Sequence, residues 1–260
     1  MSELVRTQRQ ERVLVVTVDN PPVNALSPGV AEGIVEAVRA AQTDAEIDAI
    51  IVTGAGRTFV VGADIKELGR IVAGERPMID LNPLFNEIED SAKTVIMALH
   101  GTALGGGLEL ALAGHYRIAY ADTRLGQPEV KLGLIPGAGG TQRLTRLCGP
   151  ALAKRLILGA EVLDGATAAT LGVVHWSAPR AELSARASEI AKRIADLPPA
   201  ALAASKACIA AACQPGRGGY TDELEFTRSL LTNPETQKRV TAFLTGATES
   251  STQNKSGAAR

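Results

Sequence analysis

The sequence has few of the side chains that most often carry enzyme chemistry. Among its 260 residues are three histidines, three cysteines and only 3% aromatic residues. Imidazole bases, clusters of metal ligands and aromatic platforms for stacked bases are therefore scarce. Any chemistry must use other groups, and we expect no metal site.

Neither sign of charge is in excess. The chain has 27 lysines and arginines against 28 aspartates and glutamates, for a formal net charge of -1. Binding through counterion release needs a concentrated basic surface, so we expect neither nucleic acid nor a membrane as a partner. The sequence also has no apolar run approaching the roughly 20 residues that cross a bilayer.

The three cysteines, Cys148, Cys208 and Cys213, form no C-x-x-C pair. We expect them to be small buried apolar residues in a reducing compartment rather than a redox site. The first twelve residues mix arginine with glutamate and lack the apolar core of a secretory signal. Together these features predict a cytoplasmic protein.

What the chain does contain is an alternation of strand and helix signals. Apolar and β-branched runs predict strands, and Ser27-Pro28 predicts a helix start, because serine caps a helix and proline fits its first turn. The expected strands are residues 12–19, 49–53, 95–99 and 116–120, with a further helix at 108–113. Such alternation indicates an α/β fold.

Beyond about residue 164 the chain becomes rich in alanine, and strand signals fade after Val173 and Val174. Helical periodicity runs through residues 181–197, 200–213 and 221–231. We expect a core domain over residues 1–197, a helical C-terminal region over 198–249 and a disordered tail over 250–260.

The most informative segment, residues 101–112, follows a predicted buried strand. Three consecutive glycines, Gly105 to Gly107, open a predicted helix, so its first N–H groups are unpaired and accessible to a ligand. Glu109 stands three residues beyond Gly106, about one turn along nearly the same helix face. This predicts an anion or oxyanion site beside an acid. The same residues also suit tight helix packing next to an ordinary first-turn acid, and the segment alone leaves both interpretations open.

Two further segments are broken by glycine. Residues 59–68 open a helix at Asp64, which leaves an N–H near Ala63 free and puts Lys66 in the first turn. Residues 126–140 are too rich in glycine and proline for a regular element, and they contain Glu129. A lone loop carboxylate is typical of solvated surface. Glu109 and Glu129 therefore matter for chemistry only if the fold brings them together.

Competing motifs are absent from the sequence. It has no G-x-x-x-x-G-K-[ST], no G-x-S-x-G and no H-E-x-x-H, and residues 137–142 lack the final glycine of a dinucleotide fingerprint. Nucleoside triphosphates and nicotinamide cofactors are thus disfavoured. The isolated His100, His115 and His175 are expected to be structural.

Five motifs stand in order along the chain: NPPVNAL at residues 20–26, GADIK at 62–66, ALGGGLELA at 103–111, GQPE at 126–129 and IPGAGGTQ at 135–142. Together they resemble the enoyl-CoA hydratase/isomerase, or crotonase, superfamily. The match covers most of the chain. The sequence of these motifs is especially similar to that of the hydratase half of bifunctional β-oxidation enzymes.

The resemblance implies a crotonase-like spiral of ββα units, followed by a C-terminal helical region that builds homotrimers, commonly paired into hexamers. It also implies that the backbone N–H groups of Ala63 and Gly106 form an oxyanion hole for a CoA thioester. Glu109 and Glu129 match the two catalytic glutamates of the hydratases. CoA is part of the substrate, so no cofactor is expected.

For the CoA moiety, the resemblance implies a cradle made by the backbone of Ala25, Leu26, Asp64 and Ile65. Lys66 is the natural candidate for contact with the phosphates. The sequence departs from the family near its C-terminus. Many stand-alone hydratases carry Phe-x-x-Lys-Arg there, whereas Phe243 is followed by Leu-Thr-Gly-Ala. A CoA contact across subunits is thus left open, as is the exact oligomer.

We predict an enoyl-CoA hydratase, a hydro-lyase that adds water to trans-2-enoyl-CoA thioesters and gives 3-hydroxyacyl-CoA, as in fatty acid β-oxidation. The presence of both glutamates favours this reaction, because relatives with other chemistries often lack one. Two alternatives stay open. One is a Δ3-Δ2-enoyl-CoA isomerase in which Glu129 alone shuttles a proton, and the other is a non-catalytic acyl-CoA binding protein.

Overall fold

A computed structural model describes residues 3–214 and 216–246 of the chain. The chain divides into two compact units, Met1–Asp196 and Leu197–Arg260. The predicted disordered tail at 250–260 lies outside the described residues.

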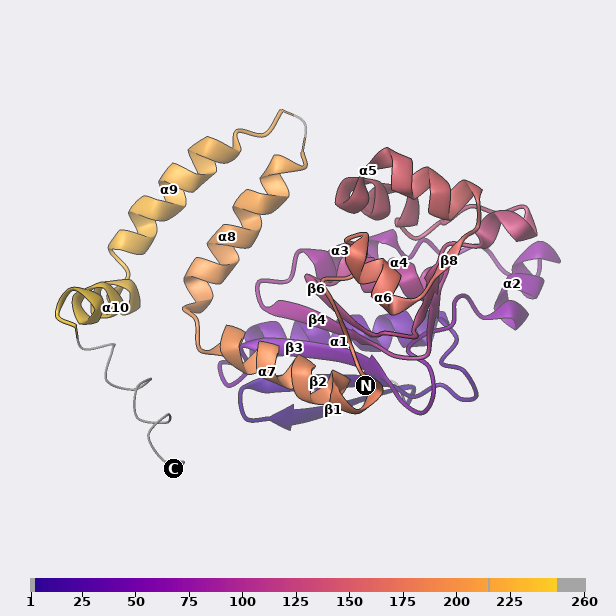
Figure 1. Ribbon diagram of the computed structural model, residues 1–260, viewed down its shortest axis with the longest axis horizontal. Helices are drawn as coiled ribbons and strands as arrows, with labels where there is room; N and C mark the ends of the chain where they lie inside the picture. Colours follow the sequence, from indigo (N-terminus) through magenta and orange to yellow (C-terminus); the bar gives the residue numbers. More distant parts are fainter. Residues whose placement is uncertain (1–2, 215, 247–260) are drawn as a thin grey trace, which may run out of the picture. The chain divides into compact units, whose positions relative to one another are not determined.

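The first unit is built on a six-stranded sheet (Figure 1). In spatial order its strands are β1 (Val5–Gln10), β2 (Val13–Val18), β3 (Ala49–Gly54), β4 (Thr94–Leu99), β6 (Tyr116–Tyr120) and β9 (Trp176–Ala178). Strand β1 pairs with β2 in antiparallel fashion, and the other neighbours are parallel. All six residues of β4 are buried, which explains its unbroken apolar run.

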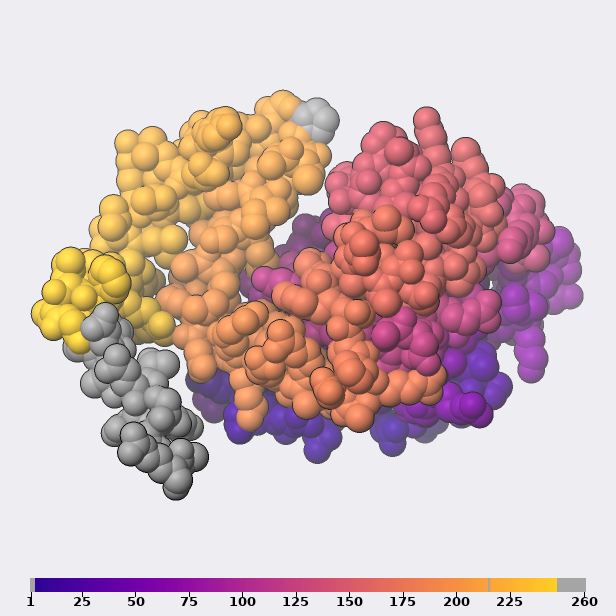
Figure 2. Space-filling model, viewed as in Figure 1, coloured from indigo at the N-terminus to yellow at the C-terminus, as the bar shows by residue number. Residues whose placement is uncertain are grey.

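Helices cover both faces of this sheet. Alternate residues such as Val16, Ile50 and Met97 pack in one core with helix α1 (Pro28–Thr43), whose Ser27 caps its first turn by accepting from the Val30 N–H. Helix α7 (Leu183–Ala195) packs on the other face (Figure 1). The period-two alternation of side chains along each strand makes the two faces distinct. Side chains of α7 lie on the surface that Figure 2 shows.

A smaller sheet of three strands, β5 (Thr102–Leu104), β7 (Arg124–Gly126) and β8 (Val162–Leu163), lies beside the first. Strand β5 runs from the end of β4 into helix α4 (Gly106–Ala113). Leu104 pairs with Gly126, so the residues that follow β7 are brought to the start of α4. This pairing determines where the candidate site forms.

The remaining elements of the first unit are helical. They are α2 (Ile65–Val72), α3 (Asn82–Glu89), the 3₁₀ helix η1 (Glu129–Leu132), α5 (Gly140–Leu158), α6 (Gly165–Thr170) and the 3₁₀ helix η2 (Arg180–Glu182). Helix α5 is kinked at Gly149, directly before Pro150, because proline cannot continue the hydrogen-bond ladder.

The second unit contains α8 (Pro199–Ala212), α9 (Gly219–Leu231) and α10 (Pro234–Leu244), of which α8 and α9 pack together. Within the described residues, no single helix is long and apolar enough to cross a membrane; only α7 and α8 taken together reach that length and composition.

The observed fold corrects three expectations from the sequence. Residues 126–140 are not wholly irregular, because Glu129 begins the 3₁₀ helix η1. Strand pairing does not end at Val173 and Val174, since the short β9 follows. The cysteines are not all buried: Cys148 packs at the edge of the core and is half-buried, Cys208 on α8 is half-buried, and Cys213 at the end of α8 is exposed.

Candidate active site

The glycine run before α4 is required by its surroundings. Gly105 caps the helix with φ 51° and ψ −126°, a conformation that residues with a Cβ avoid, and its N–H donates to the Gly126 carbonyl at 2.9 Å. A Cβ on Gly107 would overlap with the Val60 carbonyl. Tight packing therefore explains Gly107, while Gly105 joins α4 to the end of β7.

Two backbone N–H groups beside this helix start have no backbone acceptor in another part of the described chain. Leu26 and Ala63 form an isolated parallel β-bridge. The Leu26 N–H donates to the Gly62 carbonyl, and the Asp64 N–H donates to the Leu26 carbonyl. The two groups without an acceptor are the N–H groups of Ala63 and of Gly106, the first residue of α4. Neither donates to a carbonyl of another described segment. A Cβ built on Gly106 would lie 3.7 Å from the Ala63 nitrogen, so these two amides are neighbours. These are the two amides that the sequence resemblance predicts to form an oxyanion hole.

Glu109 lies within α4, one turn beyond Gly106, and only 3% of its surface is exposed. Its Oε1 accepts from the Ala138 and Gly140 N–H groups, both at 2.7 Å. Burial raises the pKa of the Glu109 carboxyl, and the two amides and the Arg143 charge oppose that rise. Glu109 is therefore a buried acid whose ionised form is held by a loop from elsewhere in the chain.

Glu129 begins η1, three residues after β7 ends. A Cβ built on Gly105 would lie 3.0 Å from its Oε1, so its carboxyl stands over the cap of α4. Burial, with a contribution from the Glu109 charge, raises the pKa of Glu129 to about 7. Such a group exchanges a proton near neutral pH.

Gln127 connects the two acids. Its side chain is completely buried, and its amide group donates to Oε1 and Oε2 of Glu129 at 2.9 and 3.3 Å. Gly140 lies between this amide and the Glu109 carboxylate, because a Cβ there would come within 2.7 Å of Gln127 and 2.9 Å of Glu109 Oε1. The fold thus brings Glu109 and Glu129 to one small volume, the condition that the sequence left open.

The residues predicted to bind CoA also lie together. Leu26 is buried, and its side chain borders Gly106, while Ala25 precedes it. Asp64 caps α2, and its carboxylate accepts from the Lys66 N–H at 2.8 Å. Ile65 and Lys66 are exposed, so the Lys66 ammonium is accessible to a phosphate in solvent.

Sequence reasoning missed the groups that hold the two acids. Gln127, the amides of Ala138 and Gly140, and Arg143 all touch Glu109, Glu129 or the loop beside them. Their signal was present in the motifs around residues 126–129 and 135–142, where a glutamine precedes the acid and glycines allow close approach. Among the described residues, no group of histidine, cysteine and acid side chains is arranged to hold a metal ion.

Two of the three histidines serve the scaffold. His115 Nδ1 accepts from the Val95 N–H at 2.9 Å, and His175 Nδ1 accepts from the Arg117 N–H at 3.1 Å. Both therefore stabilise adjoining strands of the large sheet.

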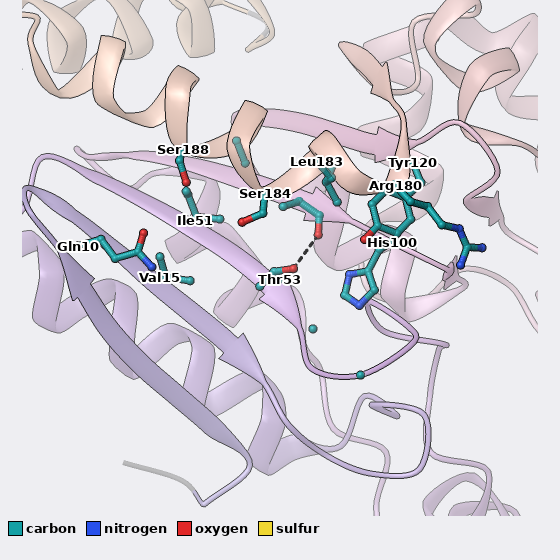
Figure 3. Close-up of a pocket in the computed structure, with 14 residues that line it drawn as sticks. Gln10, Val15, Ile51, Thr53, His100, Tyr120, Arg180, Leu183, Ser184 and Ser188 are labelled. Atoms are coloured by element: carbon teal, nitrogen blue, oxygen red, sulfur yellow. Dashed lines mark hydrogen bonds between the residues drawn. The ribbon is translucent and has the colours of Figure 1, made fainter.

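A separate hollow of about 290 Å³ lies under α7, on the other face of the large sheet (Figure 3). Its walls include Thr53, His100, Tyr120 and Ser184, and none of the site residues lines it. Arg180, the cation at its rim, is held by Asp122 at 2.7 Å. The hollow therefore offers no unpaired charge to a ligand.

Comparison with known proteins identifies the class. A family model described as enoyl-CoA hydratase/isomerase matches residues 8–249. The chain is 44% identical over 195 residues to a probable enoyl-CoA hydratase from Bacillus subtilis, covering 74% of this chain and 76% of that protein. It is also 44% identical over 162 residues to a peroxisomal bifunctional enzyme from Danio rerio, covering 62% of this chain and 22% of that protein.

The fold agrees with this match. The solved structure of an enoyl-CoA hydratase from Bacillus anthracis superposes with a TM-score of 0.85 at 29% identity, covering 94% of this chain and 97% of that one. The chain therefore belongs to the enoyl-CoA hydratase/isomerase family and has the α/β crotonase fold, with mixed sheets and C-terminal helices. The family resemblance and the fold class predicted from the sequence are both confirmed.

Proposed function

We propose that this protein is an enoyl-CoA hydratase that adds water to trans-2-enoyl-CoA thioesters. The observation that carries the proposal is the joint presence of the buried acid Glu109 and the half-buried acid Glu129 beside the N–H groups of Ala63 and Gly106, for which the described residues offer no backbone acceptor. Relatives named as hydratases support the same reaction. The acyl-CoA substrate accords with the family.

The reaction follows from the groups available. The two N–H groups bind the thioester oxygen and stabilise the enolate that forms as water adds, an effect worth about 10²- to 10³-fold per donor. Glu109 takes a proton from the water as its oxygen bonds to Cβ. Glu129, protonated near neutral pH, gives its proton to Cα. The product is the 3-hydroxyacyl thioester, and proton exchange with solvent restores both acids.

The different surroundings of the two acids support this division of roles. Glu109 accepts two backbone hydrogen bonds and lies near a cation, all of which favour its ionised form. Loss of solvation by burial and the nearby Glu109 charge both favour the protonated form of Glu129. Burial raises the pKa of both acids, but the two amides and the Arg143 charge oppose that rise at Glu109, which suits Glu109 to the role of base and Glu129 to the role of acid.

The test is the loss of enoyl-thioester absorbance when crotonyl-CoA is added to the purified protein. The wild type is expected to consume it, and Glu129→Gln to lose activity by orders of magnitude while still binding the thioester in calorimetry. Glu182→Gln, which removes an exposed acid, is the matched control and should be unaffected. Near-normal turnover by Glu129→Gln would overturn the assignment.

One further variant, Glu109→Gln, and one further substrate, a 3-enoyl-CoA, separate the alternatives. An isomerase that uses Glu129 alone would convert a 3-enoyl-CoA and tolerate Glu109→Gln, whereas the hydratase loses activity in both single variants. A binding protein would show tight association with the thioester and no change in absorbance.

We also propose that the second unit builds a trimer or a hexamer. Its helices expose large apolar side chains, including Tyr220 at 89%, Phe243 at 77% and Leu244 at 77%. Large apolar side chains that are exposed in this number on one unit favour an interaction surface. Light scattering coupled to gel filtration should give three or six times the 27.0 kDa chain mass, and a monomer would contradict the proposal.

A further inference from the structure

Arg143 is a buried cation that the hydration reaction does not use directly. It lies in the first turn of α5, and only 6% of its surface is exposed. A charge this deeply buried is costly unless it is paired and hydrogen-bonded. The partners that it holds therefore indicate what it does.

The guanidinium group binds two structural elements at once. Its Nη1 donates to the Ala138 carbonyl at 3.1 Å, on the loop whose N–H groups bind Glu109. Its Nε donates to Glu89 at 2.8 Å and its Nη2 to Asn86 at 2.6 Å, both on α3. Arg143 thus ties the Glu109 loop to α3 with three hydrogen bonds.

Gly139 makes this arrangement possible. It has φ 98°, which favours glycine, and a Cβ there would overlap with the Arg143 guanidinium. The neighbouring Gly140 makes room for Glu109 in the same way. The two adjacent glycines therefore let the backbone lie between a cation on one side and a carboxylate on the other.

Helix α3 supports the same loop at a third point. Asn82 Nδ2 donates to the Gly137 carbonyl at 3.1 Å. Asn82, Asn86 and Glu89 stand at positions i, i+4 and i+7, so they share one face of α3. That face is the fixed surface against which residues 137–143 are held.

We propose that Arg143 is a positioning residue for Glu109: it fixes the loop that binds the Glu109 carboxylate and supplies the positive charge that favours its ionised form. The chemical role rests on the proposed function, because Glu109 acts as a base only in the hydration reaction. The effect on Glu109 itself does not depend on that function.

The charges around Glu109 determine the direction in which each substitution should shift the pKa of Glu109. Arg143 lowers the pKa of Glu109, and the Glu129 carboxyl lies on the other side of Gln127. Behind Arg143 stand Glu89 and, 3.7 Å from Glu89, the exposed Arg146. Removing Arg143 should make Glu109 harder to ionise. Removing the charge of Glu89 should make Glu109 easier to ionise, because the Arg143 charge is then less compensated.

Four variants test the proposal. Arg143→Met removes the charge and the hydrogen bonds but keeps much of the volume, and Arg143→Lys keeps the charge without the planar fork. Glu89→Gln keeps an acceptor for Arg143 and removes the negative charge. Arg146→Gln is the control, since Arg146 also pairs with Glu89 but is exposed and does not touch the loop.

The first readout is the acid limb of kcat/KM against pH for crotonyl-CoA hydration. Arg143→Met should move it up by about one pH unit, which lowers the rate tenfold below the limb. Glu89→Gln should move it down and Arg146→Gln should leave it unchanged. Arg143→Lys should keep the limb near its wild-type position but lower kcat.

The second readout is the Glu109 carboxylate band in pH-difference infrared spectra of the substrate-free protein, assigned with Glu109→Gln. It should show the same shifts even if the wild type hydrates nothing, a result that would refute the proposed function alone. Unmoved titration in folded Arg143→Met, or shifts of the same sign in Arg143→Met and Glu89→Gln, would overturn the positioning role. If Arg143→Met does not fold, Glu89→Gln still tests the proposal. The pKa of Glu109 should be lower in that variant, and an unchanged pKa would overturn the proposal.

Discussion

The side-chain amide of Gln127 donates to both carboxylate oxygens of Glu129, at 2.9 and 3.3 Å. The two residues are separated only by Pro128, and the glutamine is completely buried. An N–H donor stabilises a carboxylate more than the corresponding acid. Such a donor at Gln127 opposes the rise that burial causes in the pKa of Glu129.

Replacing Gln127 with leucine should extend the protonated range of Glu129. The pKa of Glu129 should rise relative to the wild type, because the donor is lost while burial, the main cause of the raised pKa, remains. We expect the alkaline limb of hydration to move to higher pH while the maximal rate falls, since the acid is less well oriented. The measurement is kcat/KM against pH. Gln142→Leu, an exposed glutamine on α5, is the control, and equal profiles for both variants would contradict this role.

The pH profile of the wild-type enzyme should be bell-shaped. Hydration needs Glu109 ionised and Glu129 protonated, so kcat/KM should fall at acid pH as Glu109 takes up a proton. It should also fall above a pKa of about 7 as Glu129 loses its proton. Initial rates between pH 5 and pH 9 test this expectation. A rate that stays constant from pH 7 to pH 9 would show that Glu129 is not the acid.

The raised pKa of Glu129 also predicts how the stability of the folded protein depends on pH. The pKa of Glu129 is about 7 in the folded protein against an ordinary value of 4.5, so the folded state binds the proton more tightly. The bound proton of Glu129 therefore stabilises the folded state fully below about pH 4.5, and this stabilisation is lost as the pH rises through about 7. Glu129→Gln does not titrate, so its melting temperature relative to the wild type should rise between pH 5 and pH 8. A constant difference across this range would refute the shifted pKa.

Two glycine-to-alanine substitutions should have opposite effects on stability. A Cβ on Gly107 overlaps with the Val60 carbonyl, which cannot move without disturbing its bridge to Ala103. We expect Gly107→Ala to destabilise the protein by about 1–3 kcal/mol. Gly69, within α2, has nothing within 4 Å of its Cβ position, and Gly69→Ala should stabilise by about 0.4–1 kcal/mol. Urea unfolding of both variants measures these changes, and a neutral Gly107→Ala would show that α4 can shift away from Val60.

Local signals explain which elements the sequence predicted well. Helix α1 begins after Ser27 as expected, because a cap and a first-turn proline act within a few residues. Strand β6 covers residues 116–120 as expected, and β3 and β4 differ from their predicted ranges by one residue, since a buried parallel strand needs a continuous apolar run. Strand β1 escaped prediction because its polar sequence pairs at the sheet edge, where burial does not select apolar residues.

The scarcity of histidine, cysteine and aromatic residues is a property of the sequence by itself, and so are the glycines that leave helix N–H groups free and the motifs that indicate the family. Those signals are local, so they identify Ala63, Gly106, Glu109 and Glu129 one at a time. Only the tertiary structure decided that these groups meet, because the pairing of β5 with β7 brings residues 127–129 to the start of α4. It also decided how strongly each acid holds its proton, since burial, the loop amides of Ala138 and Gly140, and the Arg143 charge come from segments distant in the chain.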